Sequence, residues 1–600
     1  MADQDVVPAR QQVRLASGKF LAVLVAAFAC LYGLTFVVDI YILNILTRAL
    51  LLAVLAVTVD LLWGYTGILT FGHATYFGIG AYVCALMFGH FGLDGAWPLA
   101  ALVLAVGGSM LVAAIVGWLS FYYGASPLYA SIVSLALPIV AVQVIFAGGN
   151  FTGSSSGLSG FETYDWEIES WFVLAGLFLT VVLIGARIFV GSDYGRILVA
   201  IRENEDRCSY LGIAVSRLKI GLTVVCAGVA AIAGFVYAAF NDVVAPELAG
   251  FLLGTELLIW VALGGRGTLI GPALGTVTID VTSSYLSGSL PYLWKLLVGI
   301  AFVLVIILLP QGLARIVQDV AGKLRRDPTA KAHGHGKITR IASTPVAPAP
   351  DNIALAVDKL SRSYGSLSVL RDISFKVPGG ELMSIVGPNG AGKTTLMRCI
   401  SNGRERSSGD VLVDGHSIGS KSPNEIVALG VGRSFQNTTL FDSLTVTDCL
   451  FLARYPKKGA RKTARTQVVD LPAAAFQIVQ ATGLADMLDA EIKNLAHGKK
   501  RALELAMALA TEPSVLLLDE PTAGLTKTER TAIGKVLVEL VSTTNLAILL
   551  IEHDLDFVRE VSSRILVLHQ GTVLLDGSVE EVVSSALVKQ VYSGEAAGEQ

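Results

Sequence analysis

Residues 387–395 form the part of the chain best suited to chemistry, and they read Gly-Pro-Asn-Gly-Ala-Gly-Lys-Thr-Thr. They fit the pattern G-x-x-x-x-G-K-[ST], in which glycines let a loop turn its backbone N–H groups inward around phosphates. Lys393 can reach the terminal phosphates of a nucleotide, and the Thr394 hydroxyl can ligate Mg²⁺. We therefore predict a site for ATP and Mg²⁺ that includes Gly387, Asn389, Gly390, Gly392, Lys393, Thr394 and Thr395.

Two later apolar runs end in ionisable residues that suit the same site. Residues 515–518 lead into Asp519 and Glu520. An aspartate at a strand end beside a phosphate loop is suited to holding Mg²⁺ through water, and the next carboxylate is suited to polarising the attacking water. Residues 546–551 lead into Glu552 and His553, although His553 alone would indicate no more than a surface histidine.

These residues need an α/β domain to bring them together. From residue 353 onward, short apolar strands at 382–386, 515–518 and 546–551 alternate with amphipathic helices. This alternation is typical of a parallel sheet with helical crossovers. We expect an ATP-binding domain at residues 351–600.

The rest of the chain is too apolar to be soluble. The chain has 600 residues, 53% of them hydrophobic, with a mean hydropathy of +0.63, so a membrane portion is expected at residues 1–320. The net charge of −3 gives no electrostatic reason to expect nucleic acid as a partner. Six scattered cysteines without C-x-x-C spacing indicate reduced thiols.

Apolar runs long enough to span a bilayer predict a polytopic helical membrane domain. The expected spans are residues 20–38, 41–63, 67–89, 97–121, 127–147, 171–190, 218–240 and 291–310. Residues 251–263 and 269–286 form either two further spans or one re-entrant pair, which gives eight or ten crossings. The first run resembles a signal peptide, but its length and the spans that follow favour an uncleaved helix.

Basic residues fix the orientation of the membrane domain. Arg10, Arg14 and Lys19 precede the first span, and Lys323, Arg325 and Arg326 follow the last, so both termini are expected in the cytoplasm. The acidic loop at 148–170 then falls outside, and the basic loop at 191–219 falls inside. Residues 195–211 of the inner loop have helical apolar spacing, which predicts a helix docking on a cytoplasmic partner or, alternatively, a solvated charged loop.

Ionisable residues within the apolar runs are candidates for a solute pathway. They are Asp60, His73, Glu256 and Asp280, and each could instead fix a contact between helices. Glycines also interrupt the runs at 64–80 and 264–275. Matching interruptions are typical of repeat-built transporters, but small residues also permit close helix packing, and the periodicity is too weak to establish a repeat.

A linker at residues 321–350 separates the two halves. It contains Arg325, Arg326, Pro345, Pro348 and Pro350, and it is expected to be a polar, proline-rich tether. Its two histidines, at 333 and 335, more often indicate an exposed linker than a metal site.

The C-terminal half resembles the nucleotide-binding domain of ABC transporters. The resemblance rests on the order and approximate spacing of Tyr364, the 387–395 loop, Gln436, Leu-Ala-His-Gly-Lys at 495–499, Asp519-Glu520 and His553. It implies that Tyr364 stacks on adenine and that Gln436 senses Mg²⁺ and the membrane domain. It also implies that Glu520 is the catalytic base, that His553 contacts the γ-phosphate, and that Ala496, His497 and Gly498 complete the ATP site of the opposite subunit.

The membrane half resembles permeases of the branched-chain and hydrophobic amino acid uptake family, at residues 61–67, 71–74, 78–82, 195–205 and 264–272. Residues 432–437 and 551–554 are similar to the matching ATPase. The resemblance implies that two usually separate polypeptides are fused here, with a coupling helix at 195–211. Gln436 is then expected to relay closure of the ATP site to the loop around Arg202 and Glu203. It further implies a second permease–ATPase half, identical or related, an extracytoplasmic binding protein and a bacterial cytoplasmic (inner) membrane.

Three residues depart from the family pattern. Ala496 and Lys499 replace the usual serine and glutamine of the signature segment, and Thr526 stands where an aspartate often follows. Because the lost hydroxyl removes one expected hydrogen bond to the γ-phosphate, the site that this segment completes is expected to be the weaker one.

The expected function is ATP-driven uptake of a small solute, above all branched-chain or other hydrophobic amino acids. Urea, short amides and small carboxylates remain open as solutes. A half-exporter fits less well because it usually has about six long helices extending into the cytoplasm, and a regulatory membrane ATPase fits less well because Lys393, Glu520 and His553 are intact.

Overall fold

The computed structural model describes residues 9–93, 95–122, 127–289, 336–341, 352–438 and 440–593, with isolated positions at 293, 296, 299, 300 and 303. The chain divides into two compact units. The first contains Met1–Gly191 and Ser216–Pro328, and the second contains Ser192–Val215 and Thr329–Gln600. The inner loop that the sequence places between two spans therefore packs with the ATP-binding half.

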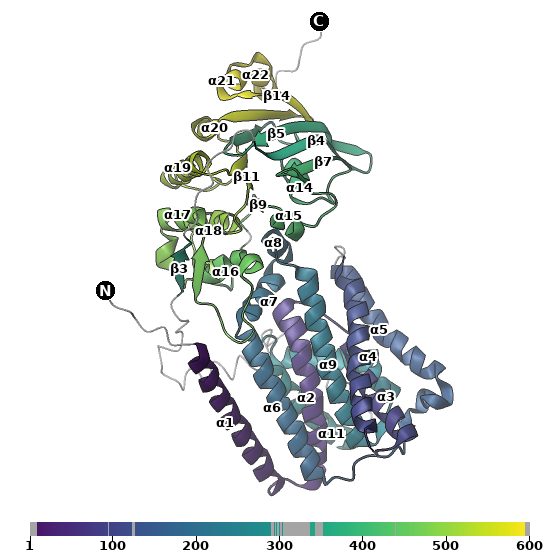
Figure 1. The fold of residues 1–600 in the computed structure, drawn as a ribbon. Coiled ribbons are helices and arrows are strands. Elements are labelled where there is room, and N and C mark those ends of the chain that lie inside the picture. The colour runs from purple at the N-terminus through teal and green to yellow at the C-terminus, as the bar shows by residue number, and fades with distance from the viewer. Residues whose placement is uncertain are drawn as a thin grey trace, which may run out of the picture. The chain divides into compact units, whose positions relative to one another are not determined.

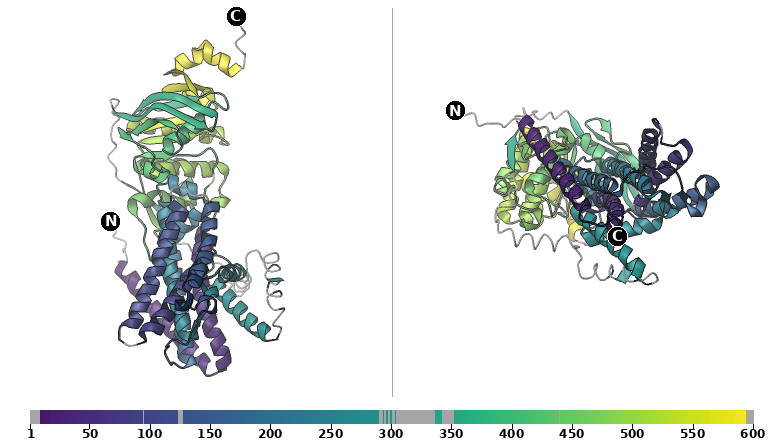
Figure 2. Two further views of the ribbon diagram at one scale, coloured as in Figure 1. Left: turned by 90° about the vertical axis from the view of Figure 1, so that its right-hand side faces the viewer. Right: turned by 90° about the horizontal axis from the view of Figure 1, so that it is seen from below.

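The first unit is a helical bundle (Figure 1, Figure 2). Its helices are α1 (Ala9–Thr35), α2 (Ile40–Thr66), α3 (His73–Phe91), α4 (Trp97–Phe121), α5 (Pro127–Ala147), α6 (Ile168–Val190), α9 (Val215–Asn241), α10 (Phe251–Gly264) and α11 (Ile270–Ser289). The most buried is α2, which contacts α6 and α11, whereas α1 lies at the edge of the bundle against α6 (Figure 1). A helix that is largely apolar, as α2 is apart from a few polar residues such as Arg48 and Asp60, belongs inside a bundle.

Six of the described helices, α2 to α6 and α9, are long and apolar enough to cross a membrane. The predicted spans at 97–121 and 127–147 coincide with α4 and α5. The helix predicted to begin at residue 67 begins at His73, because Gly67, at φ +76°, ends α2 in the left-handed conformation. The predicted span at 291–310 lies outside the described residues apart from isolated positions.

The two glycine-interrupted stretches lie against each other. The Asp60 carboxylate accepts hydrogen bonds from the backbone N–H groups of Gly267 (2.6 Å) and Leu269 (3.0 Å). The Tyr65 hydroxyl donates to the Gly267 carbonyl at 2.7 Å. A Cβ on Gly64 would lie 2.5 Å from the Gly267 nitrogen, so this approach requires glycine. The two stretches form one joint between α2 and the start of α11.

The second unit contains a six-stranded sheet in the order β14-β13-β6-β12-β11-β9. Its strands are β6 (Leu382–Val386), β9 (Val431–Arg433), β11 (Val515–Asp519), β12 (Ala547–Ile551), β13 (Arg564–His569) and β14 (Thr572–Ser578). All neighbours are parallel except β13 and β14. Every residue of β6, β11 and β12 is buried, as expected for parallel strands covered on both faces.

A second, antiparallel sheet has the order β5-β4-β7-β8, formed by Leu367–Pro378, Ile353–Tyr364, Ser408–Val413 and His416–Ser417. One hydrophobic core joins the inward residues of this sheet, such as Leu355 and Phe375, to those of the parallel sheet, such as Ile385 and Leu549. The helices that bear on the site are α14 (Lys393–Ser401), α15 (Pro423–Ala428), α16 (Val446–Lys458), α17 (Ala473–Ala481), α18 (His497–Ala510) and α19 (Lys527–Thr543). This architecture confirms the α/β fold predicted for the C-terminal half.

Two expectations need correction. The single helix expected at 195–211 is two helices, α7 (Asp193–Glu203) and α8 (Glu205–Tyr210), because Asn204 takes an extended conformation and its side chain caps α8 by accepting from the Arg207 N–H. We call residues 192–215 the connector. The linker expected as a tether contains an ordered strand, β3 (Lys337–Arg340), which pairs in parallel with β10 (Val468–Leu471).

Candidate functional site

The predicted phosphate loop lies between the end of β6 and the start of α14. Gly392 precedes the helix at φ +100°, a conformation that L side chains rarely adopt. A Cβ on Gly387 would lie 2.2 Å from the Leu568 carbonyl oxygen, so no other residue fits there without a shift. The first backbone N–H groups of α14 face the loop, and a helix N-terminus favours bound anions. The loop has the geometry needed to receive phosphates.

Lys393 folds its ammonium group into this loop. Its Nζ donates to the carbonyl oxygens of Gly387 (2.7 Å) and Pro388 (3.1 Å). Burial lowers the pKa of Lys393, while the nearby carboxylates of Glu520 and Asp519 act in the opposite direction. Phosphate oxygens are stronger acceptors for an ammonium than carbonyls are, so a nucleotide can replace these contacts.

Asp519 and Thr394 fit a bound cation. Asp519 ends β11 and is 2% exposed. Among the residues that the structure describes, its Oδ1 has no hydrogen-bond partner, although it is buried. Burial raises the pKa of Asp519, and the Thr394 hydroxyl is hydrogen-bonded to this carboxyl group. A buried carboxylate oxygen without a donor, beside a hydroxyl, matches the oxygen ligands that Mg²⁺ prefers.

Glu520 joins two other predicted residues at the end of β11. Gln436 Nε2 donates to Glu520 Oε1 at 2.9 Å, and His553 Nε2 lies 3.0 Å from the same oxygen. Glu520 has φ +50°, and its own N–H donates to the Ile551 carbonyl at 2.8 Å. A non-glycine residue in the left-handed region is strained and is held there by its surroundings, often at a functional site. The backbone therefore aims this carboxylate, and two side chains hold it.

Arg501 was not among the site residues predicted from the sequence motifs. Its guanidinium donates to the backbone carbonyls of Phe435, Gln436 (2.7 Å) and Glu520 (2.8 Å). It also forms an ion pair with Glu504, one turn further along α18, at 3.3 Å. Both charged side chains are buried. Arg501 thus ties the Gln436 and Glu520 backbones together, and the signal for it was a charged pair at i, i+3 on the apolar face of α18.

Tyr364 lies at the end of β4, and its ring is 45% exposed. The Arg362 guanidinium lies 4.2 Å from the ring centroid. Arginine over one face of the ring leaves a flat aromatic surface available to a base on the other.

The signature segment starts α18 and packs against the start of α19. Ala496 is the N-cap residue of α18, with no side-chain hydrogen bond to the helix. A Cβ on Gly498 would lie 2.6 Å from Glu529 Oε1, and one on Gly524 would lie 2.8 Å from His497 Cδ2. Thr526, the departure from aspartate, caps α19 in a capping box with Glu529.

Lys499, the other departure in this segment, points away from the first turn of α18. Its Nζ donates to the Thr482 carbonyl just beyond α17. Lysine at this position therefore satisfies the end of a neighbouring helix.

The connector helix α8 packs beside Gln436. Arg207 forms a buried ion pair with Glu504 at 2.8 Å. The rings of Tyr210 and Phe435 lie edge to face, with centroids 5.0 Å apart. Phe435 directly precedes Gln436, and Glu504 Oε1 accepts from its N–H at 2.7 Å. Gln436 was expected to relay closure to the loop around Arg202 and Glu203, and within that loop Arg207 and Tyr210 are the residues that make this contact.

Glu203 makes a separate contact. Its carboxylate accepts from the backbone N–H of Ser443 at 3.3 Å and from the Ser443 hydroxyl. Glu203 therefore also touches the ATP-binding half, but at the loop that precedes α16.

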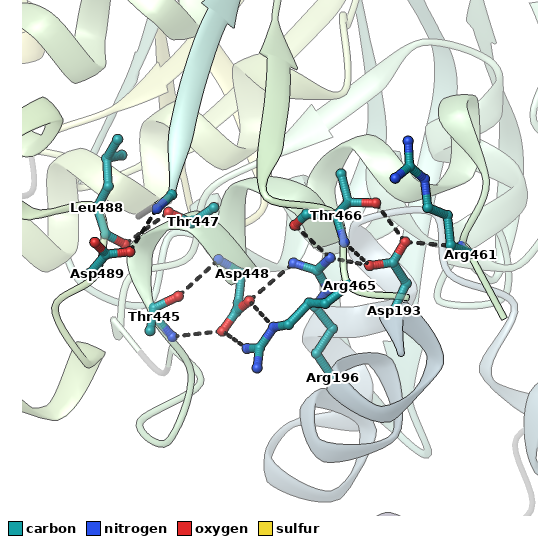
Figure 3. Close-up of polar contacts among 11 residues, drawn as sticks. Asp193, Arg196, Thr445, Thr447, Asp448, Arg461, Arg465, Thr466, Leu488 and Asp489 are labelled. Carbon is teal, nitrogen blue, oxygen red and sulfur yellow. Dashed lines mark hydrogen bonds and ion pairs between the residues drawn. The ribbon is translucent and has the colours of Figure 1, made fainter. Parts of the chain in front are cut away.

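The other connector helix, α7, enters a buried cluster of charges. Figure 3 shows Asp193 and Arg196 projecting from α7 toward Asp448, Arg465 and Thr466. Arg196 donates to Asp448 at 3.0 Å and pairs with Asp193, while Asp448 also pairs with Arg465. Asp193 accepts from the Thr466 backbone N–H and hydroxyl, each at 2.7 Å.

This cluster is neutralised from within. Burial alone would raise the pKa of Asp193, but hydrogen bonds from Arg196 and Thr466 hold it below its ordinary value. Burial is likewise outweighed at Asp448, where hydrogen bonding and charge from Arg465, and the charge of Arg196, lower the pKa. Asp193 is fully buried and Arg196 is 4% exposed. Removing one partner would leave an uncompensated buried charge.

Several ionisable residues of the helical bundle have polar partners. Arg48 on α2 forms a two-nitrogen contact with Asp280 on α11, at 3.0 to 3.2 Å, and also reaches the Ser284 hydroxyl at 2.9 Å. His73 Nε2 lies 2.8 Å from the Thr58 hydroxyl. With Asp60 bound to the Gly267 backbone, these residues fix helix contacts. A role for them in a solute pathway stays a prediction.

Comparisons with known protein families divide the chain in the same way. A family model described as "Branched-chain amino acid transport system / permease component" matches residues 41–306. A second, described as "ABC transporter", matches residues 370–523. Both halves of the chain therefore match transport families.

Curated relatives cover the ATP-binding half. The high-affinity branched-chain amino acid transport ATP-binding protein LivG of Salmonella typhimurium is 34% identical over 253 residues, which are 40% of this chain and 98% of that protein. The corresponding BraF protein of Pseudomonas aeruginosa is 33% identical over 253 residues, with the same two coverages. Among solved structures, a nucleotide-free ATP-binding cassette from an ABC transporter matches 40% of this chain and 98% of its own, at 26% identity and a TM-score of 0.36.

Proposed function

The chain belongs to the ABC transporters of the branched-chain amino acid family, with permease and ATP-binding parts joined in one polypeptide, and we propose that it takes up branched-chain or other hydrophobic amino acids. It is a multi-pass membrane protein whose ATP hydrolysis is coupled to transport. The observation that carries the proposal is the match of residues 41–306 to the branched-chain amino acid permease family, in the same chain as an ABC transporter match at residues 370–523. The contact of Phe435 with Tyr210 joins the residue before Gln436 to the connector and supports coupling between the two parts.

We assign the hydrolysis of ATP to residues near the carboxyl ends of β6, β11 and β12, together with Tyr364 at the end of β4 and Gln436, which follows β9. The 387–395 loop and Lys393 bind the phosphates, and Tyr364 supports the adenine. Glu520 accepts a proton from the attacking water, while Gln436 and His553 hold its carboxylate in place. Thr394, Gln436 and Asp519 would hold Mg²⁺, which neutralises charge that develops on the phosphates.

The residues that surround Glu520 also link the proposed ATP site to the connector. Arg501 joins the carbonyls of Gln436 and Glu520, so a shift of either reaches α18. Glu504 on α18 binds Arg207 of α8, and Phe435 contacts Tyr210. A displacement at the nucleotide therefore reaches the connector through two adjacent contacts.

We also propose the surrounding assembly. One permease and one ATP-binding part make half of the machine that the family uses, so the chain pairs with a second copy or a related fused chain. The signature segment at Ala496, His497 and Gly498 then completes the partner's ATP site. An extracytoplasmic binding protein delivers the solute, and the bacterial inner membrane holds the complex with both termini in the cytoplasm.

Uptake by the purified complex in proteoliposomes tests this proposal. Labelled leucine, urea, acetamide and acetate would be offered separately, each with candidate binding proteins and internal ATP. Leucine uptake that depends on a binding protein supports the proposal, and uptake of another solute corrects only the cargo. ATP hydrolysis that is indifferent to every binding protein, with no uptake, would contradict an importer, and outward movement would indicate a half-exporter.

A further inference from the structure

The linker is part of the ATP-binding half at one short segment, residues 336–341. The Lys337 N–H donates to the Gln467 carbonyl at 2.9 Å, and the Ile341 N–H donates to the Leu471 carbonyl at 2.8 Å. Between them, Lys337–Arg340 pair in register with Val468–Leu471. A proline-rich tether that only spans a distance needs no such backbone pairing.

Side chains and close packing make this pairing specific. The Thr339 hydroxyl donates to Asp470 at 2.6 Å, and the Gly336 N–H donates to Asp489 at 2.8 Å. A Cβ on Gly336 would lie 2.0 Å from the Thr447 hydroxyl oxygen. The linker backbone is therefore pressed against the first turn of α16.

That turn also receives the connector. Asp448, the neighbour of Thr447, binds Arg196 of α7, and Thr466, two residues before β10, binds Asp193 (Figure 3). We call the group of Thr447, Asp448, Thr466, Val468–Leu471 and Asp489 the α16–β10 junction. The connector, which lies between α6 and α9, and residues 336–341 of the linker thus attach to one small part of the ATP-binding half.

We propose that the linker strand β3 is a further coupling contact, which transmits movement of the α16–β10 junction to the permease through the linker, alongside the connector. This inference rests on the proposed function only where uptake is measured, because the hydrogen-exchange measurement needs no transported solute. The junction is continuous with α16 and lies beside α18, the helix that begins with the signature segment. Movement of that region on nucleotide binding reaches β3 directly because the two strands share backbone hydrogen bonds.

Proline scanning separates this role from that of a passive tether. The Lys337→Pro/Ile341→Pro double variant removes two N–H groups that donate to β10. Arg340→Pro is the matched control, because in a parallel ladder the N–H groups of alternate residues bond to the neighbour, so that of Arg340 faces away from β10. Hydrogen exchange at the amides of residues 468–471 in the full complex reports whether the strands have separated.

We expect the double variant to keep ATP hydrolysis within about twofold of the unmodified protein. Its uptake per ATP should fall about fivefold or more, and the ATP-dependent change in hydrogen exchange of the permease helices should shrink in parallel. Arg340→Pro should leave all three measurements close to those of the unmodified protein. This pattern of preserved hydrolysis with lost transmission is not expected from a strand that only supports folding.

Two results would overturn the proposal. One is separation of the strands with unchanged uptake per ATP and unchanged exchange in the permease. The other is an equal loss of hydrolysis and uptake, which would make β3 a structural support. If hydrogen exchange shows that the strands stay paired in the double variant, residues 336–341 would be replaced by six glycine and serine residues. The same measurements of hydrolysis, uptake per ATP and permease exchange on that variant then test the proposal. If the unmodified protein takes up no solute, the proposed function fails, and the exchange response of the permease still tests this inference.

Discussion

The nucleotide site and the α7 cluster are both rich in charge, but their charges are satisfied in opposite ways. At the nucleotide site, Lys393 binds only carbonyls and Asp519 Oδ1 is buried without a partner among the described residues. In the α7 cluster, Asp193, Arg196 and Asp448 satisfy one another. The first arrangement leaves an ammonium group and a carboxylate oxygen available to phosphates and a cation, whereas in the second the carboxylates are matched by guanidinium groups that hold two chain segments together. Lys393 and Asp519 therefore mark the proposed site of ATP hydrolysis, whereas the α7 cluster has a structural role.

The largest effect should come from removing the ammonium group of Lys393. Lys393→Ala is expected to lower ATP hydrolysis and uptake by about a hundredfold or more, because it removes a donor aimed at the phosphates. The protein should still insert in the membrane. Lys457→Ala, which removes an exposed lysine paired with Glu512, is the control. Uptake by the Lys393 variant close to the normal rate would show that this charge is dispensable.

The Glu520 carboxylate should be nearly as important. Glu520→Gln is expected to slow ATP turnover by about a hundredfold or more while ATP binding persists, because the amide cannot accept a proton from water. Glu512→Gln is a matched control, since Glu512 also has a positive φ of 54° but is partly exposed and pairs with the exposed Lys457. Turnover and nucleotide affinity would be measured on the same preparations. Equal loss in both variants would show that the Glu520 carboxylate has no specific role in the hydrolysis of ATP.

The satisfied cluster should fail in a different way. Arg196→Ala leaves Asp193 and Asp448 buried without their shared cation, which is expected to weaken the docking of α7 by about 3–5 kcal/mol. Uptake should fall more than ATP hydrolysis, and thermal unfolding of the ATP-binding half should shift down. Arg202→Ala, at a side chain that is 38% exposed, is the control. If hydrolysis disappeared with uptake, the α7 cluster would belong to the nucleotide site itself.

The smallest effect should come from the signature segment. Ala496→Ser restores a hydroxyl at the N-cap of α18, where serine is also a better cap than alanine. ATP hydrolysis should rise or stay unchanged, within about twofold, since the first N–H groups of the helix remain available. A large loss of activity, measured at saturating ATP, would show that the alanine is required.

The same contrast explains what could be predicted from the sequence. The residues proposed for the nucleotide site could be named from the sequence because each lies in a short local pattern, such as Gly387–Thr395 or the acidic pair after a buried strand. The Arg196–Asp448 pair could not be named in this way, because its members are far apart in the chain and the family resemblance at residues 195–205 names no partner for Arg196. The strand β3 was hidden as well: Lys-Ile-Thr-Arg has one strongly apolar residue, and only its distant partner β10 makes it a strand.

The break at Asn204 shows why the connector was only half predicted. Helical spacing indicated a helix across residues 195–211, but spacing does not reveal a residue that caps the next helix with its own side chain. Because the break separates α7 from α8, Arg196 contacts the α16–β10 junction and Arg207 contacts Glu504. Tertiary contacts that each helix makes separately determine this shape.

The docked strand also sets a limit on movement inside the ATP-binding half. Ile341 is fixed to β10 by its backbone, and Ile353 begins β4 in the antiparallel sheet. The chain between these two residues can reach about 40 Å when fully extended. This length is an upper limit on the distance between Ile341, which is paired with β10, and the start of β4, the strand that carries Tyr364. While β3 stays paired, the antiparallel sheet cannot move away from β10 by more than this distance.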